Sequence, residues 1–209
     1  MTEDEAKAWL LETRGVSRET FDKLDGLRHL VLAESLQQNL ISAASADQMW
    51  ARHIVDSAQL IPLAGANKGP WLDLGTGAGF PGLVVAILES RPVILVESRR
   101  KRVEFLKSVA DTLDLKNVIL HGGRLEHLSD RPASVISARA FAPLPKLLDA
   151  AFRYSRNGTV WVLPKGRSAR EELETITHSW QGVFHVEQSI TDTDAAIIVA
   201  RDVKRKRAR

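Results

Sequence analysis

The fold of this chain is decided by one stretch, Trp71-Leu72-Asp73-Leu74-Gly75-Thr76-Gly77-Ala78-Gly79-Phe80-Pro81-Gly82. It starts with apolar residues typical of a short buried strand. Glycines then follow at every second position, where a backbone without Cβ can adopt positive φ and approach a ligand closely. Pro81 precedes an apolar run, and proline is favoured in the first turn of a helix. A strand, a glycine loop and a helix in this order are typical of the ligand site at the carboxyl edge of an open α/β sheet.

Strand and helix patterns alternate after the glycine loop. We expect strands at 71–74, 92–97, 117–121, 133–137 and 158–163, and helices near 81–89, 99–113, 143–155 and 168–179. This alternation with short links predicts an α/β fold with a mostly parallel, doubly wound sheet. Two more strands, 183–190 and 195–201, follow without a helix between them, and Asp192-Thr193-Asp194 favours a hairpin turn there.

The residues before the glycine loop have helical periodicity. Helices are expected over 3–14, 17–42 and 47–60. At 209 residues, one domain is the default expectation. We therefore predict a helical cap packed on a single core and a short charged tail, with bounds 1–66 for the cap, 67–201 for the core and 202–209 for the basic tail.

Composition narrows the class of protein. The chain has no cysteine, which excludes disulfides, thiolate metal sites and a cysteine nucleophile. Its acidic start lacks the basic and apolar layout of a signal peptide, and no apolar run approaches the ~20 residues that span a bilayer, so we expect a cytoplasmic protein. Residues 1–49 hold nine acids and five bases, whereas 201–209 hold six bases and one acid. This asymmetry predicts a polyanionic partner; a disordered solubilising tail is the alternative.

Two cofactor classes are compatible with the glycine loop. Residues 77–82 match G-x-G-x-x-G, the nicotinamide fingerprint, but the first glycine after the strand is Gly75, and counted from there the register fails. Asp73 at the strand end would repel a pyrophosphate and suits a cofactor with a cationic amine. Glu97 closes the second strand and can accept hydrogen bonds from ribose hydroxyls in either class. S-adenosylmethionine is the better fit, and a nicotinamide oxidoreductase is the alternative.

Several motifs together resemble one family. They are Asn39-Leu40-Ile41, Arg52-His53-x-x-Asp56-Ser57, Asp73-x-Gly-x-Gly-x-Gly-Phe80-Pro81-Gly82, Glu97-Ser98-Arg99-x-Lys101, Arg124-x-Glu126 and Ser137-x-Arg139-Ala140-Phe141-Ala142. From about residue 20 to 200 the chain is similar to the RsmG (GidB) family. The resemblance implies a class I methyltransferase that uses S-adenosylmethionine to methylate N7 of a guanine in bacterial 16S ribosomal RNA. We expect a monomer that acts on this RNA or on the small ribosomal subunit, without a metal or a membrane.

Candidate site residues follow from the motifs and the resemblance. The expected cofactor-binding residues are Asp73, Gly75, Gly77, Gly79, Phe80, Glu97, Leu125, Glu126 and Arg139. Arg139 follows the fourth strand, where this fold class presents the transferred methyl group, and it is the candidate catalytic residue; a structural salt bridge is the alternative. Leu125 and Glu126 are assigned by the resemblance, and without it Glu126 is as well explained as a carboxylate at a helix start.

The remaining candidates concern the substrate. The residues expected to face RNA are Arg52, His53, Arg99, Arg100, Lys101, Lys165 and Arg167; solvated basic residues are the alternative. His53 and Asp56 lie three apart in an expected helix, so we predict that they pair and hold the helix over the cofactor. A capped surface helix without such a role is the alternative. The chain has no Asn/Asp-Pro-Pro-aromatic run for amine methylation. Guanine N7 already presents a lone pair, so its methylation requires positioning and no general base.

Overall fold

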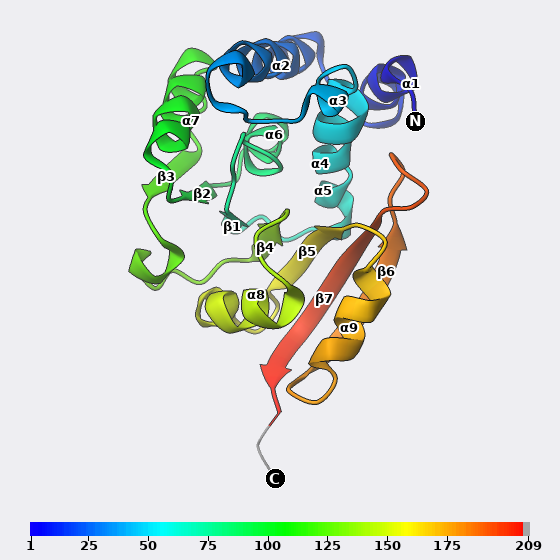
Figure 1. Cartoon of the computed structure of the whole chain (residues 1–209), viewed down its shortest axis with the longest axis vertical. Coiled ribbons are helices and arrows are strands. Elements are labelled where there is room, and N and C mark those ends of the chain that lie inside the picture. Colours follow the sequence, from blue (N-terminus) through cyan, green and yellow to red (C-terminus); the bar gives the residue numbers. More distant parts are fainter. Residues whose placement is uncertain (207–209) are drawn as a thin grey trace.

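A seven-stranded sheet with the strand order β3-β2-β1-β4-β5-β7-β6 forms the centre of the computed structural model, which describes residues 1–206 (Figure 1). The strands are β1 (Trp71–Leu74), β2 (Val93–Glu97), β3 (Val118–Gly122), β4 (Val135–Ala138), β5 (Val160–Lys165), β6 (Trp180–Gln188) and β7 (Ala196–Arg205). β1 to β5 are parallel to one another, and β7 pairs antiparallel with both β5 and β6. The predicted parallel sheet and C-terminal hairpin are confirmed. The antiparallel β7 departs from the usual dinucleotide-binding order.

The central strands are buried on both faces. Every residue of β1, β2 and β4 is buried, as expected for parallel strands covered by helices on each side. β1 pairs with β2 on one edge and with β4 on the other. The chain therefore reverses its direction of winding between β1 and β4, and ligands of doubly wound sheets bind at the carboxyl ends of strands at such a point.

Helices cover the sheet in two layers, each over its own apolar cluster. α6 (Gly82–Leu88) and α7 (Arg100–Thr112) pack on one face, where Leu83 and Phe105 belong to the buried cluster. α8 (Leu144–Ala151) and α9 (Ala169–Ile176) pack on the other face, where Leu148 and Trp180 are buried. The predicted helices of the core are confirmed, with ends that differ by one to four residues.

The N-terminal helices pack on the face that α6 and α7 cover. They are α1 (Glu3–Ala8), a π-helical turn (Trp9–Thr13), α2 (Arg18–Gln38), α3 (Ala43–Ala46), a second π-helical stretch (Trp50–Val55), α4 (Asp56–Ala58) and α5 (Leu60–Leu63). Their buried side chains join the same cluster as α6. α2 ends earlier than expected because Asn39 adopts a left-handed conformation with φ 46°. No helix of the described residues combines the length and apolar character needed to cross a bilayer.

The C-terminal hairpin directs the last described residues of the chain away from the glycine loop. β7 begins opposite Lys165 at the carboxyl end of β5 and runs antiparallel to it, so it ends at the amino edge of the sheet (Figure 1). The strand continues to Arg205, which pairs with Asp149. Of the expected tail 202–209, residues 202–205 are therefore part of β7, and 207–209 lie outside the described residues.

Candidate functional site

The glycine loop after β1 has the backbone that its sequence predicts. Gly75 and Gly79 have φ of 65° and 104°, which only glycine adopts without strain. A Cβ at Gly75 would lie 2.8 Å from the ring of Phe141, and one at Gly79 would overlap Leu83. The glycines therefore serve both the turn and the close approach of neighbouring side chains.

Asp73 anchors this loop from beneath. The residue is fully buried; its Oδ1 accepts a hydrogen bond from Ser137 Oγ (2.7 Å), and its Oδ2 accepts one from the backbone N–H of Gly82 (3.0 Å). Burial raises the pKa of Asp73 to about 6, although these hydrogen bonds oppose the shift. The carboxylate thus joins β4 to the start of α6, and the predicted direct contact with a cofactor amine stays a prediction.

Glu97 ties the end of β2 to the glycine loop. Its Oε1 accepts hydrogen bonds from the backbone N–H groups of Ser98 (2.7 Å) and Arg99 (2.8 Å), and its Oε2 accepts one from Gly77 (3.1 Å). The guanidinium of Arg102 lies 3.8 Å from Oε2. The residue is 5% exposed and faces a cavity of about 360 Å³.

That cavity brings together three of the predicted cofactor regions, which are the first glycine of the loop, the end of β2 and the turn after β3. Its lining includes Gly75, Glu97, Leu125, Glu126 and Phe141. Leu125 is buried, and its carbonyl accepts a hydrogen bond from the hydroxyl of Tyr154 (2.6 Å), whereas the Glu126 side chain is exposed and lies 3.5 Å from Arg124. We call this space the Glu97 cavity.

Phe80 and Arg139 belong to a second group of side chains. The Phe80 ring is buried and stacks on His53 with 4.9 Å between the ring centroids. The guanidinium of Arg139 lies 5.4 Å from the centre of the Phe80 ring, within the range of a cation–π interaction. The loop residue Phe80 therefore supports the side chain that follows β4.

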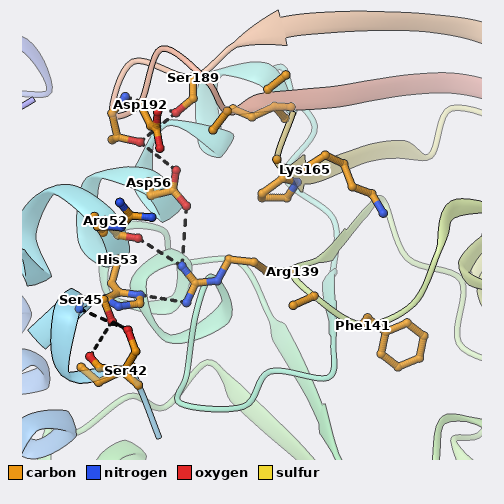
Figure 2. A pocket seen from close by; sticks show the side chains of 18 of the residues that line it. Ser42, Ser45, Arg52, His53, Asp56, Arg139, Phe141, Lys165, Ser189 and Asp192 are labelled. Carbon is orange, nitrogen blue, oxygen red and sulfur yellow. Dashed lines mark hydrogen bonds and ion pairs between the residues drawn. The ribbon is translucent and has the colours of Figure 1, made fainter. Parts of the chain in front are cut away.

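Arg139 connects β4 to the helices before the glycine loop, as Figure 2 shows. One terminal nitrogen donates to Nδ1 of His53 (2.9 Å), and the other donates to the backbone carbonyl of Arg52 (3.2 Å). The second nitrogen also lies 3.7 Å from Oδ2 of Asp56. Burial lowers the pKa of Arg139, while the charges of Asp56 and Asp73 oppose that shift.

The hydrogen bond from Arg139 defines the state of His53. A guanidinium can only donate, so Nδ1 of His53 is the acceptor and the ring proton is on Nε2. Burial, together with the charges of Arg139 and Arg52, lowers the pKa of His53 to about 3, so the ring is neutral at ordinary pH. Its Nε2 is buried and has no hydrogen-bond partner in the described part of the chain.

The predicted pair of His53 and Asp56 is wrong. Asp56 instead accepts hydrogen bonds at Oδ1 from Gln59 (2.9 Å) and Thr191 (3.0 Å). Arg139 contacts His53 with one nitrogen and approaches Asp56 with the other, so it bridges the two residues. The two side chains do share one side of the helical segment, but a cation from the end of β4 has taken the position that a direct pair would need.

A larger cavity of about 1010 Å³ opens beside these residues (Figure 2). It is lined by the loop after α2, α3, the helical stretch 52–56, the loop after β4, the end of β5, α9, the β6–β7 loop and the start of β7. The lining includes Ile41, Ser45, Arg52, His53, Asp56, Arg139, Phe141, Lys165, Ser189 and Thr191. We call this space the Arg139 cavity. Ala140 and Phe141 line both cavities, so the two spaces adjoin at the loop after β4.

Sequence reasoning missed the contribution of the β6–β7 loop. Ser189 and Thr191 bond to each other (2.8 Å), and Ser189 also accepts from Gln59 (3.0 Å). Nothing in their local sequence distinguishes them from an ordinary hairpin turn. The signal was the position of that turn, because a strand antiparallel to the fifth one must begin at the carboxyl edge of the sheet.

The basic residues expected to face RNA differ in their surroundings. Arg99 is exposed at the rim of the Glu97 cavity, and Arg100 is exposed and pairs with Glu104 of its own helix. Lys165 is 10% exposed and pairs with Glu172 (2.8 Å) inside the Arg139 cavity. Arg167 is exposed and pairs with Asp194, and Lys101 is exposed on α7. In residues 1–206, no group of three or more His, Asp or Glu is arranged to hold a metal ion.

Comparison with known proteins also indicates a methyltransferase of ribosomal RNA. A family model described as "GidB: rRNA small subunit methyltransferase G" matches residues 21–198. The chain is 54% identical over 208 residues to "Ribosomal RNA small subunit methyltransferase G" of Rhizorhabdus wittichii, covering 98% of this chain and 94% of that protein. It is 49% identical to the protein of the same name from Zymomonas mobilis, covering 99% of this chain and 97% of the other.

Solved structures agree on the fold. A putative O-methyltransferase from Klebsiella pneumoniae superposes with a TM-score of 0.63 at 17% identity, over 92% of this chain and 94% of that one. An O-methyltransferase from Bacillus cereus in complex with SAH gives a TM-score of 0.62 at 14% identity, over 93% and 96%. The predicted class I methyltransferase fold is thereby confirmed. Together with the match over residues 21–198, these findings identify the chain as a member of the rRNA small subunit methyltransferase G (GidB) family.

Proposed function

We propose that this chain transfers the methyl group of S-adenosylmethionine to N7 of a guanine in 16S ribosomal RNA. Family membership supports the reaction and the RNA. The observation that carries the proposal is the pair of adjoining cavities at the carboxyl edge of the sheet, which share Ala140 and Phe141. A methyl transfer requires a donor and an acceptor in neighbouring spaces, and this arrangement provides them. The protein acts in the cytoplasm as a monomer, on 16S RNA or on the small subunit.

The Glu97 cavity fits the cofactor. The carboxylate of Glu97 is held by three backbone N–H groups, two on Oε1 and one on Oε2, so Oε2 has a further lone pair for a ribose hydroxyl. Leu125 offers a buried apolar side chain for the face of an adenine. The absence of a Cβ at Gly75 leaves room beside Phe141 that any other residue would fill. Asp73 is fully buried and acts by holding the loop in place through the hydrogen bonds to its two oxygens.

The Arg139 cavity fits the target base. It is larger than the Glu97 cavity, it opens to the surface, and it carries polar side chains on an otherwise apolar lining. Arg139 lies between the cavity and the Phe80 ring, so its guanidinium is oriented before a base enters. Arg99 lines the Glu97 cavity and is followed in the chain by exposed Arg100 and Lys101, and exposed Arg167 follows Gly166 of the Arg139 cavity. We infer that these basic residues contact RNA phosphates.

The surroundings of His53 favour a nucleophile that needs no base. S-adenosylmethionine supplies an electrophilic methyl group when it is bound. His53 cannot remove a proton from the substrate, because its Nδ1 lone pair already accepts from Arg139 and its Nε2 carries the ring proton. Guanine N7 attacks with an in-plane lone pair and loses no proton. Arg139, oriented by His53 and Arg52, positions the base for that attack.

Single-turnover methyl transfer tests the proposal. The wild-type protein, a labelled methyl donor and small-subunit RNA particles that lack the modification should yield 7-methylguanosine. Arg139→Ala should lower the rate of the chemical step by about 100-fold or more, because it removes a preorganised group from the cavity wall. Arg153→Ala is the matched control, since Arg153 is an exposed arginine paired with Asp130 away from both cavities.

Two results would overturn the proposed function. One is a labelled product whose methyl group lies on an atom other than N7 of guanine. The other is tight binding of a nicotinamide dinucleotide together with no measurable binding of S-adenosylhomocysteine in titration calorimetry. Equal loss of activity in Arg139→Ala and Arg153→Ala would instead remove Arg139 from its assigned role.

A further inference from the structure

The two carboxylate oxygens of Asp56 are held differently, one by hydrogen bonds and the other by an ion pair with Arg139. Oδ1 accepts hydrogen bonds from Gln59 (2.9 Å) and Thr191 (3.0 Å). Oδ2 accepts no hydrogen bond from any residue in the described part of the chain. Its nearest donor is Arg139, whose nitrogen is 3.7 Å away, beyond hydrogen-bond distance. The side chain is 18% exposed and lines the Arg139 cavity.

A network of hydrogen bonds holds Asp56 in this orientation. Gln59 is buried; its amide nitrogen donates to Asp56 and to Ser189, and its amide oxygen accepts from the backbone N–H of Ile190 (3.0 Å). Thr191 donates to Asp56 from the same loop. The α4 segment and the β6–β7 loop therefore fix Oδ1 together, and Oδ2 is left toward the cavity and Arg139, as Figure 2 shows.

Oδ2 of Asp56 faces the Arg139 cavity with lone pairs that can accept hydrogen bonds from a ligand that supplies N–H groups. Its negative charge strengthens any hydrogen bond that it receives. Among the four RNA bases, guanine alone presents two adjacent donors on its Watson–Crick edge, N1–H and the 2-amino group. Adenine presents an acceptor at N1, and the single donors of uracil and cytosine lie next to acceptors.

The location also agrees with the orientation that methylation at N7 would require. In a purine, N1 and the 2-amino group lie on the opposite side from N7. The two cavities adjoin at Ala140 and Phe141, so N7 has to face that side. In Figure 2, Arg139 lies between Phe141 and Asp56. A group that reads the Watson–Crick edge is expected at the far side of the cavity, where Asp56 lies.

We infer that Oδ2 of Asp56 accepts hydrogen bonds from N1–H and the 2-amino group of the target guanine and thereby selects guanine in the Arg139 cavity. The inference rests on the proposed function and adds to it the residue that identifies the base. Asp56 is a specificity-determining residue, and Gln59 and Thr191 are positioning residues that act through it.

An atom-replacement experiment tests this assignment. Small-subunit particles are reconstituted with RNA that carries guanosine or inosine at the methylated position, and single-turnover rates are measured. Inosine lacks only the 2-amino group and retains N7, and the enzyme is kept in excess over the RNA but below saturation so that each particle reacts in a single turnover. For the wild-type protein we expect guanosine to react about 10- to 100-fold faster than inosine, as for the loss of one hydrogen bond to a charged group.

The variant Asp56→Asn should abolish or reverse this preference. In this variant Gln59 and Thr191 still donate to an oxygen at the Oδ1 position, so they hold the asparagine amide with its oxygen there. The asparagine NH₂ group then takes the place of Oδ2 and faces the N–H donors of guanine, with which it cannot form a hydrogen bond. Thr191→Val is the matched control. It removes a hydrogen bond to Oδ1, so we expect the methylation rates of guanosine and inosine to fall by the same factor. The ratio of the two rates should therefore stay unchanged.

The ratio between the two bases is taken within each variant, so a reduced folded fraction does not affect it. Equal rates for guanosine and inosine with the wild-type protein would overturn the inference even if Asp56→Asn failed to fold. So would a guanosine preference that survives in Asp56→Asn. In either case 7-methylguanosine would still form and the proposed function would stand, whereas a methyl group on another atom would remove the proposed function itself.

Discussion

Replacing Asp73 with asparagine should change how the stability of the protein depends on pH. The pKa of Asp73 is about 6 in the folded protein, against 3.8 for the free side chain, and burial is the main cause. The folded state therefore binds the proton more tightly than the unfolded state. The stabilisation by the protonated carboxyl is complete below pH ~4 and is lost as the pH rises through ~6. Above that pH the ionised carboxylate costs about 3 kcal/mol, from ~1.36 kcal/mol per pKa unit.

The amide introduced by Asp73→Asn has no such titration, although it has a constant cost of its own. Ser137 and Gly82 donate to different oxygens of Asp73, and an amide group has only one oxygen with which to accept. This mismatch does not vary with pH. The readout is thus the difference in unfolding free energy between wild type and Asp73→Asn, which should shift in favour of the variant by about 3 kcal/mol between pH 4 and pH 7.

Urea unfolding at half-unit steps from pH 4 to pH 8 measures this difference. Titration of His53 and of surface carboxylates is common to both proteins and cancels in it. The variant Ser137→Ala gives a second measurement. Loss of its hydrogen bond to Asp73 should raise the pKa of Asp73 further, so the pH at which the protein loses this stabilisation should be higher. If the difference between wild type and Asp73→Asn stays constant across the range, the buried carboxylate is not titrating as described.

Three further outcomes are expected. Glu97→Ala should weaken binding of S-adenosylhomocysteine by about 10- to 150-fold in calorimetry, since ribose hydroxyls lose a charged acceptor; unchanged affinity would exclude that contact. Gly75→Ala and Gly158→Ala both place alanine at positive φ, but only the former meets Phe141, so only Gly75→Ala should reduce cofactor affinity as well as thermal stability. The rate of the chemical step should be flat from about pH 6 to 9, because His53 is neutral there; a limb near pH ~6.5 that disappears in His53→Ala would make His53 a base.

The core of the fold could be predicted because its signals are local. Strands buried on both faces appear as continuous apolar runs, as in Trp71–Leu74 and Val93–Glu97, and the alternation with helices then defines a doubly wound sheet. The interruptions of the N-terminal helices were harder to foresee. Trp50–Val55 contains no glycine or proline, so its π-helical turns depend on tertiary packing, including the stacking of Trp50 on Phe21.

The parts of the candidate site that depend on short sequence spacings could also be predicted, whereas the contacts between distant segments could not. Glu97 and the glycine loop are recognised from short spacings, and the structure brings them together in one cavity. The surroundings of Arg139 depend on residues 86 positions away in the sequence, so a helical spacing of three wrongly favoured a pair between His53 and Asp56. The role of Thr191 could not be predicted for the same reason, because its hydrogen bond to Asp56 joins residues 135 positions apart in the sequence.

From the charges around Arg139 we expect recognition of the base and stability of the fold to be coupled at this site. Arg139 is a mostly buried cation whose charge is balanced by Asp56 on one side and by Asp73 on the other, and these acids come from different segments. His53 contributes no charge and orients the guanidinium through a single lone pair. Removing Arg139 leaves two buried carboxylates without their cation, a change that destabilises the fold as well as the reaction. The loss of rate in Arg139→Ala therefore measures positioning only after correction for the folded fraction. The ratio between two bases at Asp56 needs no such correction, and this makes base selection the more direct probe of how the site works.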